Sequence, residues 1–133
     1  MVIVDTSVWV DVLRDGTGSE RAALGAALGE DEAVLTRFTQ LELLQGARNE
    51  REWGLLETSL DTQTYAEAGP STWSDAARIY FDLRRAGRTV RSPIDCCIAQ
   101  IAVDHGHLLL HRDRDFEEIG AIRPLRHEWL PPA

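Results

Sequence analysis

The chain opens with the stretch MVIVDTSVW, Met1 to Trp9, in which an apolar, β-branched run ends abruptly at Asp5, Thr6 and Ser7. A short run of this kind is typical of a strand that is buried on both faces of a parallel sheet. Ligands of such sheets bind at the carboxyl ends of the strands, which is where Asp5 stands. The same residue types also cap helices, and a helix is expected here from about Ser7 to Leu13. Both interpretations of Asp5, helix cap and site residue, stay open at this point.

The length of 133 residues, with 44% hydrophobic and 27% charged residues, predicts one soluble globular domain over residues 1–133. The formal net charge is -8, and all 14 basic residues are Arg. This acidity argues against broad electrostatic binding of nucleic acid, because phosphates need a basic surface. A nucleic-acid partner must therefore be reached through metal ions or a local basic strip. The acidic excess also suits a basic protein partner.

No apolar run approaches the roughly 18 residues that a membrane span needs, and the start of the chain shows no export signal. We therefore expect a cytoplasmic protein with no membrane contact. Cys96 and Cys97 are adjacent in a helical pattern, so neither a disulfide nor a zinc site is expected. We interpret both as small buried apolar residues.

Helical and extended patterns alternate along the rest of the chain. The expected helices cover residues 19–29, 37–46, 48–60, 70–87 and 92–106, and the expected strands cover 34–35, 62–65 and 108–110. This order predicts an α/β fold with a mostly parallel central sheet and helices on both sides. In the helix after Pro70, we expect the stripe of Trp73, Tyr80 and Phe81 to face the core.

A group of four arginines marks the end of that helix and the loop after it: Arg84, Arg85, Arg88 and Arg91. Cations near a helix C-terminus complement the helix dipole, so a solvated face is one interpretation. In an otherwise acidic chain, they are also the best candidates for contact with a phosphate.

Four acidic residues stand where such a fold would gather ligands. Asp5 and Asp113 follow buried strands, Asp95 begins the buried face of a helix, and Glu42 lies among leucines. Each also has a structural explanation, as a helix cap, a capping-box partner or a helix-surface residue. If all four met within about 5 Å, each ionised pair would cost roughly 3 kcal/mol, and the six pairs would exceed the stability of a typical domain. Such a site requires a cation.

Oxygen ligands of this kind suit Mg²⁺ or Mn²⁺ rather than zinc. A divalent ion held by carboxylates activates water and stabilises charge on a phosphoryl group, which is the chemistry of metal-dependent nucleases. The acidic residues therefore point to phosphodiester hydrolysis.

Four segments resemble, in order, the successive motifs of PIN-domain ribonucleases: Val4 to Trp9, Leu41 to Gly46, Asp95 to Ala99 and Leu109 to Phe116. Their order and spacing are most similar to those of the VapC-like toxins of bacterial toxin–antitoxin pairs. Each motif is weak alone, but the four together span nearly the whole chain.

The resemblance implies a single PIN domain acting as a Mg²⁺- or Mn²⁺-dependent endoribonuclease toxin. It implies an acidic quartet of Asp5, Glu42, Asp95 and Asp113. Asp5 and Asp95 match the most direct metal ligands, while Glu42 and Asp113 would complete the site directly or through water. The family further implies a homodimer and a VapB-like antitoxin, whose basic tail would enter the acidic site.

Other positions match the family less fully. Thr6 or Ser7 corresponds to a hydroxyl that orients the site, and Asp115 corresponds to a position that is often acidic, so these are assisting candidates. The four arginines become candidates for RNA contact. His111 departs from the Thr or Ser that the family usually has, and we interpret it as a structural residue.

Two other classes of function compete with this prediction. An aspartyl-phosphate protein would also place Asp5 after a first strand, but its phosphatases usually carry an acid where Ser7 stands, and its receivers need a Lys that this chain lacks. A non-catalytic PIN-fold module for interaction or RNA binding is the second alternative. The intact quartet argues against it, because a decayed site should have lost a carboxylate.

Overall fold

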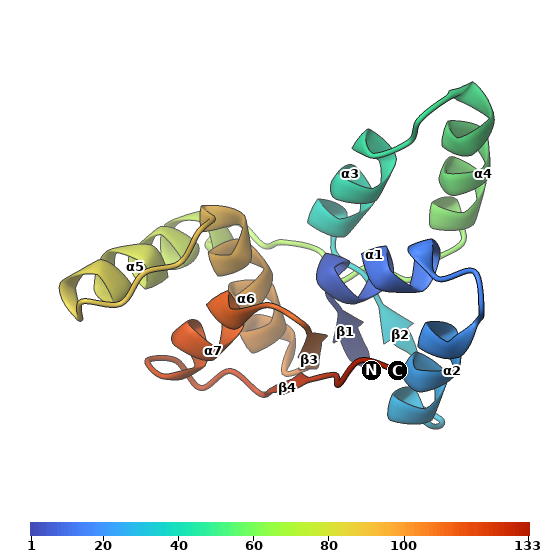
Figure 1. Ribbon diagram of the computed structural model, residues 1–133. Helices are drawn as coiled ribbons and strands as arrows, with labels where there is room; N and C mark the ends of the chain where they lie inside the picture. Colours follow the sequence, from blue (N-terminus) through green and yellow to red (C-terminus); the bar gives the residue numbers. More distant parts are fainter.

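The structure is a computed structural model that describes residues 1–133. Its centre is a parallel sheet with the strand order β2-β1-β3-β4 (Figure 1). The strands are β1 (Val2–Val4), β2 (Ala33–Val34), β3 (Leu108–His111) and β4 (His127–Trp129). The helices are α1 (Thr6–Arg14), α2 (Ser19–Leu28), α3 (Arg37–Gln45), α4 (Glu50–Asp61), α5 (Thr72–Arg85), α6 (Pro93–His105) and α7 (Arg114–Gly120). The predicted α/β class with a parallel sheet is confirmed.

The helices cover the two faces of the sheet in separate layers, because successive strand residues point to opposite faces. Ile3 and Leu109 pack into a core cluster with residues of α5, α6 and α7. Val2, Val4 and Leu110 pack on the other face with residues of α1 and α2. Figure 1 shows these two groups of helices on opposite sides of the strands. Helices on both sides of the sheet were expected from the sequence.

Helices α3 and α4 form a hairpin that projects from the sheet beside α1 (Figure 1). Its base is closed by a small cluster of Leu35, Leu43 and Leu60, with Trp9 and Val10 of α1 packed against it. This packing holds α3, and with it Glu42, next to the first turn of α1.

The pairing of β1 with β3 fixes the edge at which the site forms. Val4 lies opposite Leu110, and the Asp5 N–H donates to the Leu110 carbonyl at 2.9 Å. The chain leaves β1 into α1 and β3 into α7 at this same edge. Asp5 and Asp113 are therefore brought together, as the strand pattern predicted.

One expected strand is absent, and one strand that was not expected is present. Residues 62–65 do not form a strand, because only Tyr65 pairs, in an isolated bridge with Leu35. Strand β4 was not expected at all. It is three residues long, and two of these are exposed, so the sequence carries no apolar run that marks it.

The expectation that the aromatic stripe of α5 faces the core is also wrong. Trp73 is 56% exposed, and Tyr80 and Phe81 are each 37% exposed. The buried stripe of α5 consists instead of smaller residues: Thr72, Ala76, Ile79 and Leu83. Both stripes have helical spacing, so periodicity does not choose between them. Helix α5 packs mainly on α6, whose buried face includes Ala99 and Ala102, and close packing of two helices favours small side chains at the contact.

No helix of the structure is both long enough and apolar enough to cross a membrane.

Candidate active site

The four predicted acidic residues line one open cavity of about 230 Å³ at the carboxyl ends of β1 and β3. Asp5 caps α1, Glu42 lies in the middle of α3, Asp95 stands in the first turn of α6, and Asp113 caps α7. The remaining lining residues are Thr6, Ser7 and Val10. The fold therefore brings together side chains that are up to 108 positions apart, from Asp5 to Asp113.

Asp5 is both a helix cap and a pocket residue, so the two interpretations of the opening stretch are compatible. One oxygen, Oδ2, accepts the Ser7 N–H at 3.0 Å and the Ser7 hydroxyl at 2.6 Å. The residue is only 4% exposed, and burial raises the pKa of its carboxyl, while the bonds from Ser7 act in the opposite direction. A buried anion of this kind gains from a cation nearby.

The two predicted hydroxyls each hold one acid. Besides donating to Asp5, the Ser7 hydroxyl accepts the Arg112 N–H at 2.9 Å, which ties the end of β1 to the end of β3. Thr6 Oγ1 is hydrogen-bonded to Glu42 Oε1 at 3.0 Å and to Thr39 Oγ1 at 2.9 Å. Thr6 thus orients Glu42. Thr39 is a further polar partner that the sequence did not indicate.

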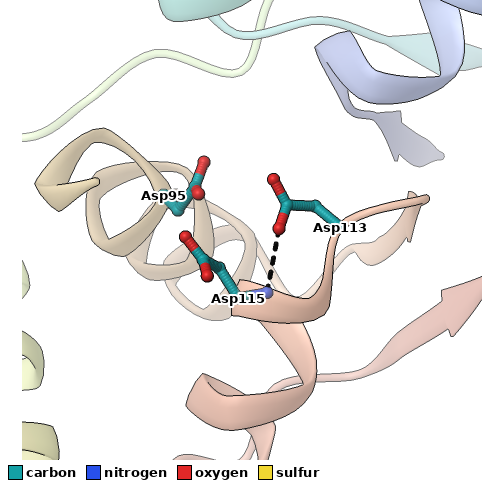
Figure 2. A group of neighbouring side chains, drawn as sticks. All are labelled: Asp95, Asp113 and Asp115. Carbon is teal, nitrogen blue, oxygen red and sulfur yellow. Dashed lines mark hydrogen bonds between the residues drawn. The ribbon is translucent and has the colours of Figure 1, made fainter. Parts of the chain in front are cut away.

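Asp95, Asp113 and Asp115 form the tightest group of carboxylates. One oxygen of each lies within 4.8 Å of the others, and Figure 2 shows the three side chains converging from α6 and the start of α7. Asp115 is 4% exposed, and its N–H donates to Asp113 Oδ1 at 2.9 Å. Asp115, which was expected only to assist, therefore belongs to this group, although it does not line the pocket as Asp95 and Asp113 do.

The Ser92 cap of α6 differs from the expected capping box. The Ser92 hydroxyl accepts the Ile94 N–H at 3.1 Å, and no return bond runs from the Ser92 N–H to Asp95. The Asp95 carboxyl instead faces the acidic group. Burial, a hydrogen bond with Asp115 and the charges of Asp113 and Asp5 raise its pKa to about 9.

This set of residues fits a divalent cation. The donors are carboxylate oxygens, which Mg²⁺ and Mn²⁺ prefer. The pKa of Asp95 is raised first by burial and further by the neighbouring carboxylates, and a cation would offset both effects. A bound divalent ion would favour the ionised form of each carboxyl.

Of the four arginines expected to contact phosphate, only Arg91 touches the site. Its Nη2 lies 3.0 Å from Asp113 Oδ1, and its backbone N–H donates to Asp115 Oδ2 at 2.9 Å. Arg88 pairs with Glu118 at the surface. Arg84 and Arg85 lie over the rings of Tyr80 and Phe81 of α5.

His111 is fully buried, which agrees with the structural role expected for it. Its Nδ1 accepts the Asp113 N–H at 3.2 Å, so its Nε2–H donates to His127 Nδ1 at 3.0 Å. Burial and the neighbouring His127 lower the pKa of His111 to about 4, which keeps the ring neutral. The pair fixes the turn that carries Asp113. His127 was missed because it lies on β4, which has no clear sequence pattern.

Residues 2–122 match the family model described as the PIN domain. The chain therefore belongs to the PIN-domain family. Within it, the chain is a VapC-like member. Ribonuclease VapC11 of Mycobacterium tuberculosis (strain ATCC 25618 / H37Rv) is 36% identical over 130 residues, which cover 95% of this chain and 96% of that protein. Ribonuclease VapC51 of the same strain is 30% identical over 131 residues, covering 98% and 93%.

Solved structures agree on the fold. A crystal structure of VapBC2 from Rickettsia felis bound to a DNA fragment from their promoter contains a chain with a TM-score of 0.78 and 16% identity, covering 98% of this chain and 100% of that one. A chain of VapBC-1 from nontypeable Haemophilus influenzae gives a TM-score of 0.74 at 20% identity, with 98% of both chains covered. The expectation of a PIN fold is confirmed.

Proposed function

We propose that this protein is a divalent-metal-dependent endoribonuclease and the toxin of a toxin–antitoxin pair. One observation carries the proposal: Asp5, Glu42, Asp95 and Asp113 line a single pocket at the carboxyl ends of two parallel strands. An acidic pocket would repel RNA unless it held cations, and the same cations supply the chemistry of phosphodiester hydrolysis. The relatives named VapC ribonucleases support this proposal.

The roles of the residues follow from their positions. Asp5 and Asp95 would hold Mg²⁺ or Mn²⁺, and Glu42 and Asp113 would complete the site directly or through water. When bound, the ion lowers the pKa of a water molecule and neutralises charge on the phosphoryl group. The chain's own hydroxyls contribute orientation, because Ser7 fixes Asp5 and Thr6 fixes Glu42. Asp115 would add negative charge beside Asp95 and Asp113.

The proposal is tested by incubating the purified protein with total cellular RNA, in Mg²⁺ or Mn²⁺ and in EDTA. Discrete cuts that need metal would support it. If the folded protein binds metal and cuts no RNA, the alternative of a non-catalytic PIN-fold module for interaction or RNA binding gains the support that the nuclease loses.

We further propose a VapB-like antitoxin as partner, since chains of this fold occur in the VapBC structures. A basic or Arg-bearing segment would complement the acidic pocket, in line with the net charge of -8. We expect the affinity of the pair to fall roughly tenfold when NaCl rises from about 0.1 to 0.5 M, because salt screens charges that solvent reaches. Isothermal titration calorimetry at both salt concentrations measures this. An affinity that does not respond to salt would contradict an electrostatic contact.

A homodimer formed through α5 is also proposed. Trp73, Tyr80 and Phe81 form an exposed aromatic stripe, and Trp73 meets the ring of Phe38 from α3 edge-on, with the ring centroids 6.1 Å apart. Contiguous exposed apolar surface marks an interaction site, and a two-fold dimer buries the same surface of both copies.

We expect the wild-type protein to have the mass of a dimer in light scattering at about 50 μM. This concentration is well above a dissociation constant of about 1 μM, so a specific dimer of that affinity would be mostly formed. Phe81→Glu should shift it to the monomer, because the charge would be buried without a partner. Leu55→Ser, at a residue that is 63% exposed on α4, serves as the control and should leave the mass unchanged. A monomeric wild type, or a Phe81→Glu dimer, would refute this interface.

A further inference from the structure

Arg91 is the only basic side chain that forms ion pairs with the acidic group. Its guanidinium lies 3.0 Å from Asp113 Oδ1 and, through Nε, 3.9 Å from Asp115 Oδ1. All other arginines in ion pairs contact acids outside the pocket and outside the group of Asp95, Asp113 and Asp115. One positive side chain thus stands at the edge of a site made of carboxylates.

The backbone and the side chain of Arg91 are held very differently. The backbone N–H donates to Asp115 Oδ2 at 2.9 Å, and that carboxyl is nearly buried. The side chain, in contrast, is 79% exposed. An exposed ion pair is weak, because water competes for both partners. The residue is therefore fixed beside the site while its guanidinium can change partners at little cost.

A divalent cation at the acidic group changes what the guanidinium meets. Asp113 Oδ1 already accepts the Asp115 N–H and Arg91 Nη2. A cation held by Asp5 and Asp95 in the pocket that Asp113 also lines would add two positive charges close to the guanidinium. The two cations repel each other, so each lowers the affinity of the site for the other.

The scissile phosphate of an RNA would then offer the guanidinium a better partner. A phosphate must lie against the metal to be hydrolysed, and Asp113, which Arg91 contacts, lines that pocket. A planar guanidinium can donate two parallel hydrogen bonds to phosphate oxygens. The exposed side chain needs only a rotation about its own bonds to do so.

We propose that Arg91 exchanges partners during the reaction, from Asp113 and Asp115 to an RNA phosphate when a divalent cation occupies the carboxylates. It thereby lowers the affinity of the pocket for the metal and raises the affinity of the metal-loaded protein for RNA. This inference rests on the proposed ribonuclease function and assigns a substrate-binding role to one residue of it.

The test compares Arg91→Gln with Arg51→Gln, which removes an equal charge from an exposed position on α4 that forms no ion pair. Mn²⁺ affinity is measured by calorimetry without RNA. Affinity for a fluorescein-labelled single-stranded RNA is measured by stopped-flow anisotropy, before cleavage proceeds, in Mn²⁺ and in EDTA. For Arg91→Gln we expect Mn²⁺ to bind about 2- to 10-fold more tightly and RNA to bind roughly 10-fold more weakly in Mn²⁺, with a smaller loss in EDTA. Arg51→Gln should change neither.

The two effects have opposite signs, which a purely structural role would not produce. Weaker binding of both Mn²⁺ and RNA would show that Arg91 only positions the acids, and would overturn the proposal. Tighter Mn²⁺ binding with unchanged RNA binding would reduce Arg91 to a counter-ion, and would also overturn it. Because neither measurement needs cleavage, a wild-type protein that cuts no RNA would contradict the proposed function without affecting this test.

Discussion

Replacing Asp5 by Asn is expected to lower the rate of RNA cleavage by at least about a hundredfold while leaving the fold intact. Asp5 is proposed to hold the metal, and loss of its charge should remove a few kcal/mol of transition-state stabilisation, where each 1.4 kcal/mol is about a factor of ten in rate. The Asn oxygen can still accept the bonds that Ser7 donates to Asp5. Burial raises the pKa of Asp5, which means that the fold favours the neutral form of this carboxyl, so a neutral Asn is not expected to destabilise it.

The melting temperature in EDTA should therefore be equal to or higher than that of the wild type. Asp75→Asn is the matched control, since Asp75 is exposed in the first turn of α5 and does not line the pocket. It should retain full activity. Metal-dependent cleavage by a well-folded Asp5→Asn protein would contradict the assignment of Asp5 to the active site.

The second large effect that we expect is a loss of folded-state stability with rising pH, caused by Asp95. Its pKa in the folded chain is about 9 against an ordinary value of 3.8, so between these values the folded state holds a proton that the unfolded state releases. Stability must then fall as pH rises through this window, by at most about 1.4 kcal/mol per pH unit for one proton. In EDTA, we expect the melting temperature to drop by about 5 °C between pH 7 and pH 8.5. We begin at pH 7 because histidines of the unfolded chain take up protons at lower pH and would add their own pH dependence.

Asp95→Asn should remove most of this drop, and saturating Mn²⁺ should remove it from the wild type, because the ion holds Asp95 ionised. Thermal unfolding of both proteins at several pH values, with and without Mn²⁺, measures the slopes. A wild type in EDTA that is equally stable at pH 7 and pH 8.5 would mean that Asp95 titrates normally. The acidic group would then be less crowded than its geometry indicates.

The sequence was sufficient for the parts of the fold that have a clear local pattern. The apolar runs before Asp5 and Asp113 marked the two central strands, and Gly106, with φ of 69°, ends α6 as expected. Parallel pairing of those strands then dictated that the two acids meet.

Features that depend on tertiary contacts could not be predicted from the sequence. Two stripes of α5 have the same period, and only its packing on α6 selects the smaller residues for burial. Strand β4 exists through its pairing with β3 rather than through its own pattern. The place of Asp115 within the acidic group, and of Arg91 beside it, arises from the turn into α7 and the loop before α6. Such contacts leave no periodic signal.

We propose that a divalent ion held by the acidic pocket makes this protein a ribonuclease. This proposal is tested most directly by following RNA cleavage and Mn²⁺ binding by the same wild-type preparation over one range of Mn²⁺ concentrations. We expect no cleavage in EDTA and a cleavage rate that rises with the same midpoint as the binding isotherm. Cleavage that persists in EDTA, or saturated binding with no cleavage, would contradict it.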